Sequence, residues 1–447
     1  MSAKTSFLTK TLGCRVNQAE TKKISNQLVA LGCQEAKNSR PPDVVIINTC
    51  VITKKAETES AKAIRHLKKT YPNCFLIATG CAANLWLKVS KKTHLPPADL
   101  FITNEKKSTI PQIIAKRFSF SCQIRDLARL KHNILLSDPG SNKRMFVKIQ
   151  DGCNHFCSYC IVPYLRTKPT SKKPKQIINE INRACQLGAK EVVLCGINLS
   201  LFGQYLGQST SFADLIEEIL KKTDIPRLSL SSLTPKLVDQ KLIDIFIADQ
   251  EKNQRLSSYW HLALQSGSET VLGRMNRQTN LGKLSKSLHY IKERIPHFTL
   301  RADIMIGFPD ETDQEFDQTL GFIKNNGFVF GHLFPYSPRP KTLAQEMLKQ
   351  GVWQIVSDQT KKFRKEKLIF ALEKNRQIET KNLVGNQRLV LILKSTSYGW
   401  WGLSDNYWPT KIKVKKNANE GLVGKIVPVK ITDFEDKALR GNLIRTN

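Results

Sequence analysis

The sequence predicts an α/β protein of three domains: a doubly wound α/β layer, a partial (β/α)6 barrel and a small β-barrel. Three observations support this fold class. Short apolar segments alternate with polar helical patterns in the N-terminal quarter, six more strand-like segments alternate with helices in the centre, and a period of two follows residue 383. We therefore expect domains at 4–120, 139–375 and 376–447, joined first by a basic linker at 122–140.

Composition and charge restrict the class of protein. The 447 residues are 40% hydrophobic and 24% charged, as in ordinary globular proteins. No stretch is long and apolar enough for a membrane span, and residues 1–10 lack the core of a signal peptide, so we expect a cytoplasmic protein without a membrane partner. The net charge of +32 favours nucleic acid as partner, although a generally lysine-rich proteome would give the same charge.

Cysteines follow the predicted strands of the first domain. Four apolar segments are predicted to be strands: 5–12, 43–48, 74–80 and 100–103. Because the carboxyl ends of parallel strands share one edge of a sheet, we expect Cys14, Cys50 and Cys81 to form a common site. The alternative is that they are small buried hydrophobes. That is our interpretation of the isolated cysteines Cys33, Cys74, Cys122, Cys185 and Cys195.

The strongest motif is a loop of three more cysteines, Cys153, Cys157 and Cys160, directly after the apolar segment 145–150. A strand that runs into such a tight loop gathers the sulfurs around one point, and thiolates select zinc, copper(I) or iron–sulfur clusters. A cubane cluster has four irons, so three cysteines leave one iron open to a substrate or cofactor. Zinc is the alternative, with His155 as a cramped fourth ligand.

The central domain reads as a partial (β/α) barrel. Its six strand-like segments begin near Met145, Glu191, Arg227, Trp260, Thr299 and Gly331. Barrels of this kind gather their chemistry at the carboxyl ends of the strands, which is where the cysteine loop lies. Small or polar residues follow the later strands, but such residues are also ordinary in turns.

The C-terminal part combines positive charge with aromatic side chains. Residues 350–378 are predicted to form one amphipathic, basic helix, and 389–393, 411–414 and 425–431 are predicted strands of a small β-barrel. Residues 381–447 hold 12 Lys/Arg and 5 Asp/Glu. The interleaved aromatic residues are Tyr398, Trp400, Trp401, Tyr407 and Trp408. They could stack on unpaired bases, but we expect about half of them to form the barrel core.

Two sets of motifs resemble a known family. The cysteine loop, with Tyr159 before its last cysteine, resembles the signature of radical S-adenosylmethionine (SAM) enzymes. Six further segments resemble motifs of the radical-SAM methylthiotransferases, and the resemblance covers essentially the whole chain: 11–21, 48–53, 79–81, 261–269, 303–309 and 334–340. Asp310 and Thr167 depart from the pattern, because both stand where the family usually has glycine.

This resemblance implies two [4Fe-4S] clusters and SAM as cofactors. Cys153, Cys157 and Cys160 would hold the SAM-binding cluster; Cys14, Cys50 and Cys81 would hold an auxiliary cluster that supplies the inserted sulfur, and both would face one cavity. The SAM pocket would include Tyr159, Gly196, Ser231, Gln265 and Gly307. The C-terminal barrel resembles the RNA-binding TRAM domain.

The implied reaction is the addition of a methylthio group to C2 of an adenine ring in tRNA. The segments 17–21, 153–157 and 163–164 look most like the group that modifies N6-threonylcarbamoyladenosine at position 37. Within the family the alternatives are N6-isopentenyladenosine and an aspartate of a ribosomal protein. The implied partners are a tRNA anticodon stem-loop and an electron donor such as flavodoxin or ferredoxin.

Two hypotheses from other classes remain open. A non-catalytic RNA-binding protein with a structural metal would need no open iron. A different radical-SAM enzyme would not need Cys14, Cys50 and Cys81.

Overall fold

The computed structural model describes residues 5–36, 40–89, 95–118, 143–204, 210–397, 399–413 and 420–444. The chain divides into two compact units. The first contains residues 1–139, 151–170 and 337–345, and the second contains residues 140–150, 171–336 and 346–447. The predicted linker at 122–140, and with it Cys122, lies outside the described residues. Within the described part, no helix is long and apolar enough to cross a membrane.

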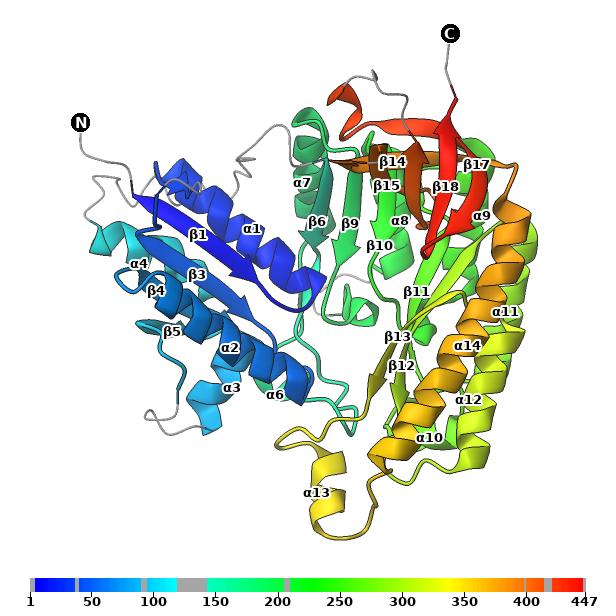
Figure 1. The fold of residues 1–447 in the computed structure, drawn as a ribbon, viewed down its shortest axis with the longest axis horizontal. Coiled ribbons are helices and arrows are strands. Elements are labelled where there is room, and N and C mark those ends of the chain that lie inside the picture. Colours follow the sequence, from blue (N-terminus) through cyan, green and yellow to red (C-terminus); the bar gives the residue numbers. More distant parts are fainter. Residues whose placement is uncertain are drawn as a thin grey trace. The chain divides into compact units, whose positions relative to one another are not determined.

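The first unit is built on a parallel five-stranded sheet in the order β2-β1-β3-β4-β5 (Figure 1). Its strands are β1 (Ser6–Thr11), β2 (Gln34–Glu35), β3 (Val44–Thr49), β4 (Phe75–Gly80) and β5 (Leu100–Ile102). Its helices are α1 (Arg15–Ala30), α2 (Lys54–Thr70), α3 (Cys81–Val89), α4 (Ile110–Arg117) and α6 (Val162–Leu165). The predicted doubly wound layer is therefore confirmed.

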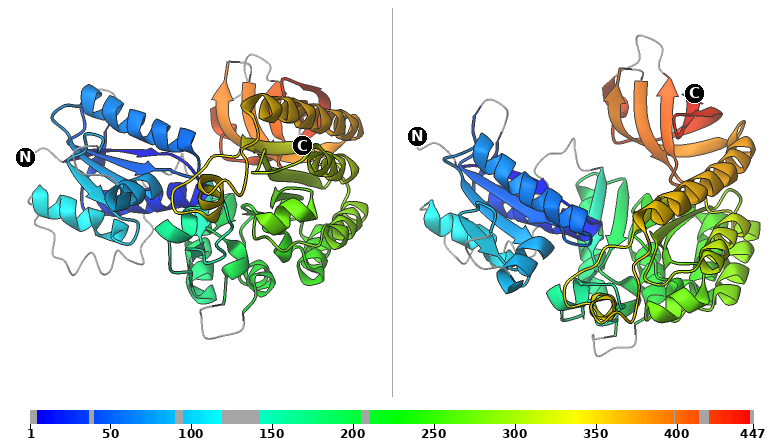
Figure 2. Two further views of the ribbon diagram at one scale, coloured as in Figure 1. Left: turned by 90° about the horizontal axis from the view of Figure 1, so that it is seen from below. Right: turned by 60° about the horizontal axis from the view of Figure 1, so that its bottom comes forward.

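Helices cover both faces of this sheet (Figures 1 and 2). Strand β3 is buried along its whole length, because successive side chains point to opposite faces and each face has a core. Val44 and Ile46 pack with side chains of α1 and α4. Val45 and Ile47 pack with side chains of α2, α3 and α6. This double burial fixes the register in which the strand ends, and the cysteines that follow them, are presented.

The second unit contains the six predicted central strands, all parallel to their neighbours. They are β6 (Arg144–Lys148), β9 (Glu191–Cys195), β10 (Arg227–Leu230), β11 (Tyr259–Gln265), β12 (Thr299–Ile306) and β13 (Phe330–Pro335). They form two sheets, β10-β9-β6 and β11-β12-β13. Two parallel bridges, Leu228 to Leu256 and Leu233 to Leu262, connect the two sheets. This arrangement is the partial (β/α)6 barrel that the sequence predicts.

Helices follow the central strands in the order expected for such a barrel. They are α7 (Pro174–Gln186), α8 (Phe212–Lys222), α9 (Gln240–Lys252), α10 (Glu269–Arg274), α11 (Leu281–Arg294), α12 (Asp313–Asn325), α13 (Leu343–Lys349) and α14 (Asp358–Leu383). Several start at a side-chain cap, as the sequence signals lead one to expect. Ser211 and Thr312 form complete capping boxes with Asp214 and Glu315.

A closed five-stranded barrel ends the chain, with strand order β14-β15-β16-β18-β17. Its strands are β14 (Gln387–Thr396), β15 (Gly399–Ser404), β16 (Pro409–Lys413), β17 (Ile426–Glu435) and β18 (Ala438–Leu443). The small barrel packs on the central strands: Trp408 Nε1 donates to Thr299 Oγ1 at 2.8 Å, and the buried Arg227 donates to the Leu389 and Leu403 carbonyls at 2.7 and 2.9 Å.

One expectation for the C-terminal part needs correction. The helix predicted at 350–378 begins at Asp358 behind the cap residue Ser357 and continues to Leu383. It is not simply amphipathic, because Arg364 is buried in an ion pair with Glu311 while Phe370 is exposed. Among the described aromatic residues of the small barrel, Trp400, Tyr407 and Trp408 are buried and Trp401 is half-buried. Trp400 and Trp408 belong to the barrel core, so the expectation that about half of these rings form it is confirmed.

Candidate metal centres and cofactor site

Three neighbouring strand ends of the first unit carry Cys14, Cys50 and Cys81. Parallel pairing places Thr11 of β1 beside Asn48 of β3, and Thr49 beside Gly80 of β4, so the three strands end at one level of the sheet. Cys14 is the N-cap residue of α1, Cys50 follows β3, and Cys81 is the first residue of α3. The N-termini of two helices, whose partial positive charge favours thiolates, therefore adjoin the cysteines.

The three thiols lie close enough to affect one another. A methyl group on Gly13, where φ is +91°, would lie 2.7 Å from Sγ of Cys50, so the turn before Cys14 packs directly on that sulfur. Burial raises the pKa of Cys14, and the charge of Cys81 raises it further. Burial also raises the pKa of Cys50 to about 11, with smaller contributions from Cys81 and Cys14. A metal cation that replaced their protons would offset the thiolate charge that burial disfavours.

A buried guanidinium group lies against the cysteine trio. Arg166 Nε donates to Sγ of Cys81 at 3.5 Å, and its side chain is 2% exposed. The same group forms two bonds to Glu20, at 2.9 and 3.0 Å, and one to Asp151 at 2.7 Å. Burial alone would lower the pKa of Arg166, but the charges of Cys81, Glu20 and Asp151 raise it well above its ordinary value. Arg166 is therefore a fixed positive charge beside a thiol that is suited to bind metal.

Buried amides complete the surroundings of this site. Asn17 donates to the carbonyls of Leu12 and Thr49 at 2.9 and 3.1 Å, which ties the turn before Cys14 to the end of β3. Asn104 Nδ2 approaches Sγ of Cys81 at 3.6 Å. Hydrogen bonds to a ligating sulfur orient it and tune the metal that it binds.

The loop of Cys153, Cys157 and Cys160 also belongs to the first unit. The Cys153 amide donates to the Arg166 carbonyl at 3.1 Å, and the Cys160 amide donates to the Cys157 carbonyl at 2.9 Å. Phe156 has a φ of +44°, which turns the chain sharply inside the loop. All three cysteines are half-buried. A loop of this kind leaves its thiols partly accessible, which a site with an open iron requires.

The candidate SAM residues of the second unit follow consecutive strands. Gly196, Ser231 and Gly307 follow β9, β10 and β12, and Gln265 is the last residue of β11. Gln265 has a φ of +72°, and its buried Oε1 makes no hydrogen bond within the described residues. A strained residue with a buried acceptor of this kind would suit a ligand with donor groups, such as the amino or hydroxyl groups of SAM. The fifth candidate, Tyr159, is half-buried in the first unit.

Glycine at position 196 allows neighbouring side chains to pack closely. A methyl group on it would lie 2.8 Å from Cδ2 of Leu199 and 3.0 Å from Cβ of Gln150. The residue thus permits close packing at the end of β9, whatever binds above it. Sequence reasoning also assigned no role to Arg166, Glu20 or Asn17. Each is an ordinary polar residue by itself. The signal in the sequence was position: Asn17 and Glu20 lie in the motif segment 11–21, and Arg166 directly precedes Thr167.

Both units match known families. Residues 6–102 match the uncharacterized protein family UPF0004, and residues 147–323 match the radical SAM superfamily. The chain is 33% identical to the threonylcarbamoyladenosine tRNA methylthiotransferase MtaB of Chlamydia pneumoniae, over 97% of each chain. It is 30% identical to the tRNA-2-methylthio-N(6)-dimethylallyladenosine synthase of Pelotomaculum thermopropionicum, over 96% of each chain.

The solved structures that resemble this chain share its fold at low sequence identity. One is the radical SAM methyltransferase TsrM of Kitasatospora setae, with tryptophan and a SAM analogue bound. The two chains superpose with a TM-score of 0.51 and 10% identity, covering 78% of this chain and 76% of the other.

Proposed function

This chain belongs to the radical-SAM tRNA methylthiotransferases, and from that premise we propose that it adds a methylthio group to C2 of N6-threonylcarbamoyladenosine at position 37 of tRNA. The observation that carries the proposal is the gathering of Cys14, Cys50 and Cys81 at one edge of a parallel sheet. A second set of thiols with a buried cation beside it suits the auxiliary cluster that this family uses.

The enzyme uses two [4Fe-4S] clusters and SAM, and we assign their ligands as follows. Cys153, Cys157 and Cys160 hold the cluster whose open iron binds SAM, and the other trio, described above, holds the auxiliary cluster. These groups, when bound, supply a 5′-deoxyadenosyl radical, the inserted sulfur and the methyl group. The protein holds the thiolates, keeps water from the sulfur site by burial, and positions the adenine.

SAM recognition is assigned to the strand ends of the central barrel. Gln265 Oε1 is suited to accept from a donor of the cofactor, because it is buried and makes no other bond in the described residues. Ser231 is buried, and its amide donates to the Leu194 carbonyl at 2.9 Å, which fixes the β10 end. Gly307, with a φ of +66°, turns the chain after β12. Tyr159 and Gly196 complete the proposed set.

The substrate of the enzyme is tRNA, and we propose that it binds through its anticodon stem-loop. The loop would present adenosine 37 as an unstacked base, the form in which proteins read RNA by stacking and base-edge contacts. The TRAM-like barrel would hold the backbone, because its exposed surface is basic and offers the half-buried Trp401 with Lys394 above its ring at 5.3 Å. A flavodoxin or ferredoxin would supply electrons, and the cytoplasm would be the compartment.

Replacing Cys14, Cys50 and Cys81 together by alanine tests the cluster assignment. The purified, reconstituted variant should hold about half the iron of the wild type, cleave SAM under reducing conditions, and fail to thiolate RNA. A matched variant with Cys33, Cys74 and Cys185 replaced removes three thiols outside the site and should keep the full iron content. Full thiolation by the first variant would reject the assignment.

The substrate is tested with two anticodon stem-loops that differ only at adenosine 37. One carries the threonylcarbamoyl group and the other the isopentenyl group, because relatives named for both chemistries match this chain. Mass spectrometry of the digested RNA should show the methylthio product from the first. Product from the isopentenyl RNA alone, or from neither RNA, would overturn the proposed substrate.

A further inference from the structure

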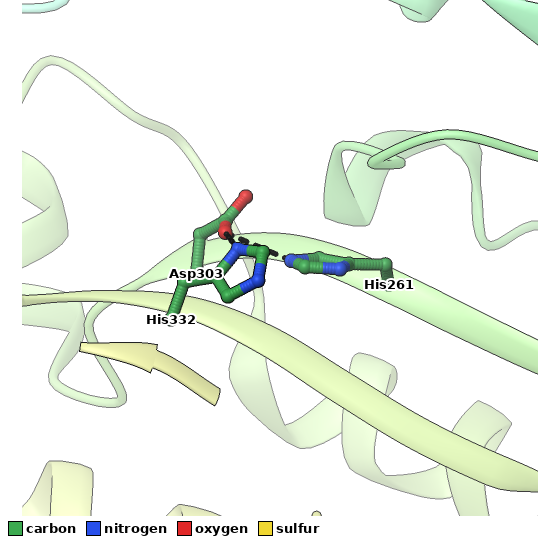
Figure 3. Close-up of side chains that lie close together, drawn as sticks. All are labelled: His261, Asp303 and His332. Carbon is green, nitrogen blue, oxygen red and sulfur yellow. Dashed lines mark hydrogen bonds and ion pairs between the residues drawn. The ribbon is translucent and has the colours of Figure 1, made fainter. Parts of the chain in front are cut away.

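Three side chains of the second unit form a polar cluster on neighbouring strands. Figure 3 shows His261 of β11, Asp303 of β12 and His332 of β13 turned toward one another. Oδ1 of Asp303 lies 2.8 Å from Nε2 of His261 and 3.0 Å from Nδ1 of His332. The other carboxylate oxygen, Oδ2, accepts from Ser232 Oγ at 3.2 Å. The cluster therefore joins both three-stranded sheets through side chains.

The strand register shows which face of the sheet carries this cluster. Asp303 pairs with His332, and Ala302 pairs with Gly331. A methyl group on Gly331 would lie 3.0 Å from Cδ1 of Leu372 in α14, so Gly331 faces that helix. Because successive strand residues point to opposite faces, Asp303 and His332 point away from α14. They lie on the inner face of the barrel, where Ser232 reaches them from the end of β10.

The cluster is accessible, and its Asp303 lies on the same strand as the position before Gly307, one of the candidate SAM residues. The side chains of His332 and Asp303 are 67% and 20% exposed, whereas that of His261 is 5% exposed. Asp303 stands three residues before the end of β12, which is about 10 Å along the strand at the usual rise per residue. Gly307, which follows that end, belongs to the proposed SAM pocket. A group that projects inward from an adenine near SAM would meet His332 and Asp303.

Resting on the function proposed above, we propose that His332 and Asp303, backed by His261, bind the N6 substituent of the target adenosine and select the threonylcarbamoyl group over the isopentenyl group. The threonylcarbamoyl group offers N–H, carbonyl, hydroxyl and carboxylate groups to polar partners. The isopentenyl group is a five-carbon hydrocarbon chain with none. Docking a hydrocarbon on Asp303 and His332 would displace their water without returning any hydrogen bond, which is costly.

The division of roles within the cluster follows from the contacts. His261 and Ser232 hold the two carboxylate oxygens of Asp303, so the carboxylate is fixed in place and can accept a substrate N–H or hydroxyl. His332 contacts Asp303 through Nδ1, which leaves Nε2, on the opposite side of the exposed ring, for a polar group of the substrate. Sites that bind substrate through hydrogen bonds discriminate strongly against analogues that lack them.

The test uses the full-length reconstituted enzyme with His332 replaced by leucine. On the threonylcarbamoyl stem-loop, kcat/KM should fall about ten- to a hundredfold, the effect of losing one or two hydrogen bonds to polar groups. On the isopentenyl stem-loop it should stay the same or rise, so the ratio of the two kcat/KM values is the diagnostic quantity. His289→Leu, an exposed histidine of α11 bonded to Ser285, is the matched control and should leave the ratio unchanged.

A second variant and a metal assay separate the alternatives. Asp303→Asn keeps the shape of the side chain and removes its charge. Because a neutral amide holds its water less strongly than a carboxylate, a hydrocarbon displaces that water at lower cost. The ratio should therefore also shift toward the isopentenyl RNA. Equal losses on both RNAs, or an unchanged ratio in both variants, would overturn the inference. So would the loss of one bound metal ion per chain in either variant, because the cluster would then be a metal site. A wild-type enzyme that modifies only the isopentenyl RNA would instead reject the proposed function.

Discussion

Nε of Arg166 lies 3.5 Å from Sγ of Cys81, while the carbonyl of the same residue accepts the amide of Cys153 at 3.1 Å. One residue thus contacts a thiol of the first trio with its side chain and the backbone of the second trio with its main chain. Glu20 and Asp151 neutralise the buried guanidinium group and hold its orientation. Arg166 is therefore positioned to tune the cluster that we propose for the first trio while shaping the loop of the second trio.

Arg166→Gln should make the auxiliary cluster harder to reduce. A positive charge beside a ligating sulfur stabilises the electron that reduction adds, so its loss lowers the reduction potential. A charge-assisted hydrogen bond worth about 1.4 kcal/mol corresponds to about 60 mV for a one-electron couple. The measurement is a potentiometric titration in a background with Cys153, Cys157 and Cys160 replaced by alanine, which leaves only the auxiliary cluster.

The control for this experiment is Arg339→Gln. Arg339 is also 2% exposed and paired with a carboxylate, Glu57, but the described structure records no contact from it to a cysteine. The control should leave the potential within error of the background. A shift of the same size in both variants would mean that the effect is general loosening of the first unit, and no shift in either would refute the tuning role of Arg166.

The cysteine trio was predictable because strand ends are readable in the sequence. Each of the three cysteines lies within two residues of the end of a predicted strand, and parallel strands end at a common edge. Arg166 was not predictable in this way, since it follows a helix of only four residues, α6, and reaches Cys81 across 85 positions of the chain. Long-range polar contacts of this kind have no periodicity and emerge only once the backbone is folded.

A similar limit explains the error in the long helix. Basic residues in a helical pattern suggested a solvated face, but Arg364 of α14 is buried against Glu311 and Asp313. Helix α14 begins at Asp358 and not at the predicted residue 350, because the preceding loop is bonded to another part of the chain. Asp310 and Gln354 exchange two hydrogen bonds at 2.8 and 3.0 Å. Asp310 has a φ of +57°, which fits a position where the family usually has glycine.

Trp401→Ala should weaken RNA binding, whereas its neighbour Trp400 has a structural role. Successive residues of β15 point to opposite faces: Trp400 is 4% exposed in the barrel core, and Trp401 lies on the other face beneath Lys394. Loss of one stacked base costs about 1–3 kcal/mol, or roughly a five- to 150-fold rise in Kd. Fluorescence anisotropy with a labelled anticodon stem-loop measures it.

The matched variant Trp400→Ala distinguishes stacking from stability. It should lower the urea midpoint of unfolding by more than Trp401→Ala does, because Trp400 is buried in the core and Trp401 is only half-buried against Tyr259 and Tyr407. An unchanged Kd in the Trp401 variant would show that the half-buried ring takes no part in RNA recognition, and that charge alone acts at this barrel.

Trp408→Ala should destabilise the second unit by about 3–5 kcal/mol. The Trp408 side chain is fully buried, its Nε1 donates to Thr299 Oγ1 at 2.8 Å, and its ring packs edge-on against Phe330 at 4.8 Å. The substitution removes one of the buried contacts between the small barrel and the central strands, and leaves the Thr299 hydroxyl without its donor. Pulse proteolysis in urea should show the lower midpoint.

Phe370→Ala on α14 is the control, because that ring is 60% exposed and its removal should change stability by less than about 0.5 kcal/mol. If both variants unfolded at the wild-type midpoint, the small barrel would not depend on Trp408 for its attachment.

Cys33 should react with iodoacetamide far more slowly than an ordinary thiol, with a characteristic dependence on pH. Burial raises its pKa from 9.0 to about 11. At pH 8 about one molecule in a thousand would then carry the thiolate, compared with about one in ten for an unperturbed group. The alkylation rate, followed by peptide mass spectrometry, should therefore rise about tenfold per pH unit from 7.5 to 9.5 without levelling off.

The same shift affects stability, and its sign follows from proton linkage. The folded chain holds the Cys33 proton more tightly than the unfolded chain, so this residue contributes stability below pH 9 that is lost as the pH rises toward 11. Cys33→Ala should therefore flatten the fall of the urea midpoint between pH 8.5 and 10. A rate that levels off near pH 9 would instead mean that alkylation occurs after local opening, in which the thiol has its ordinary pKa, and the buried environment of Cys33 would not control its reactivity.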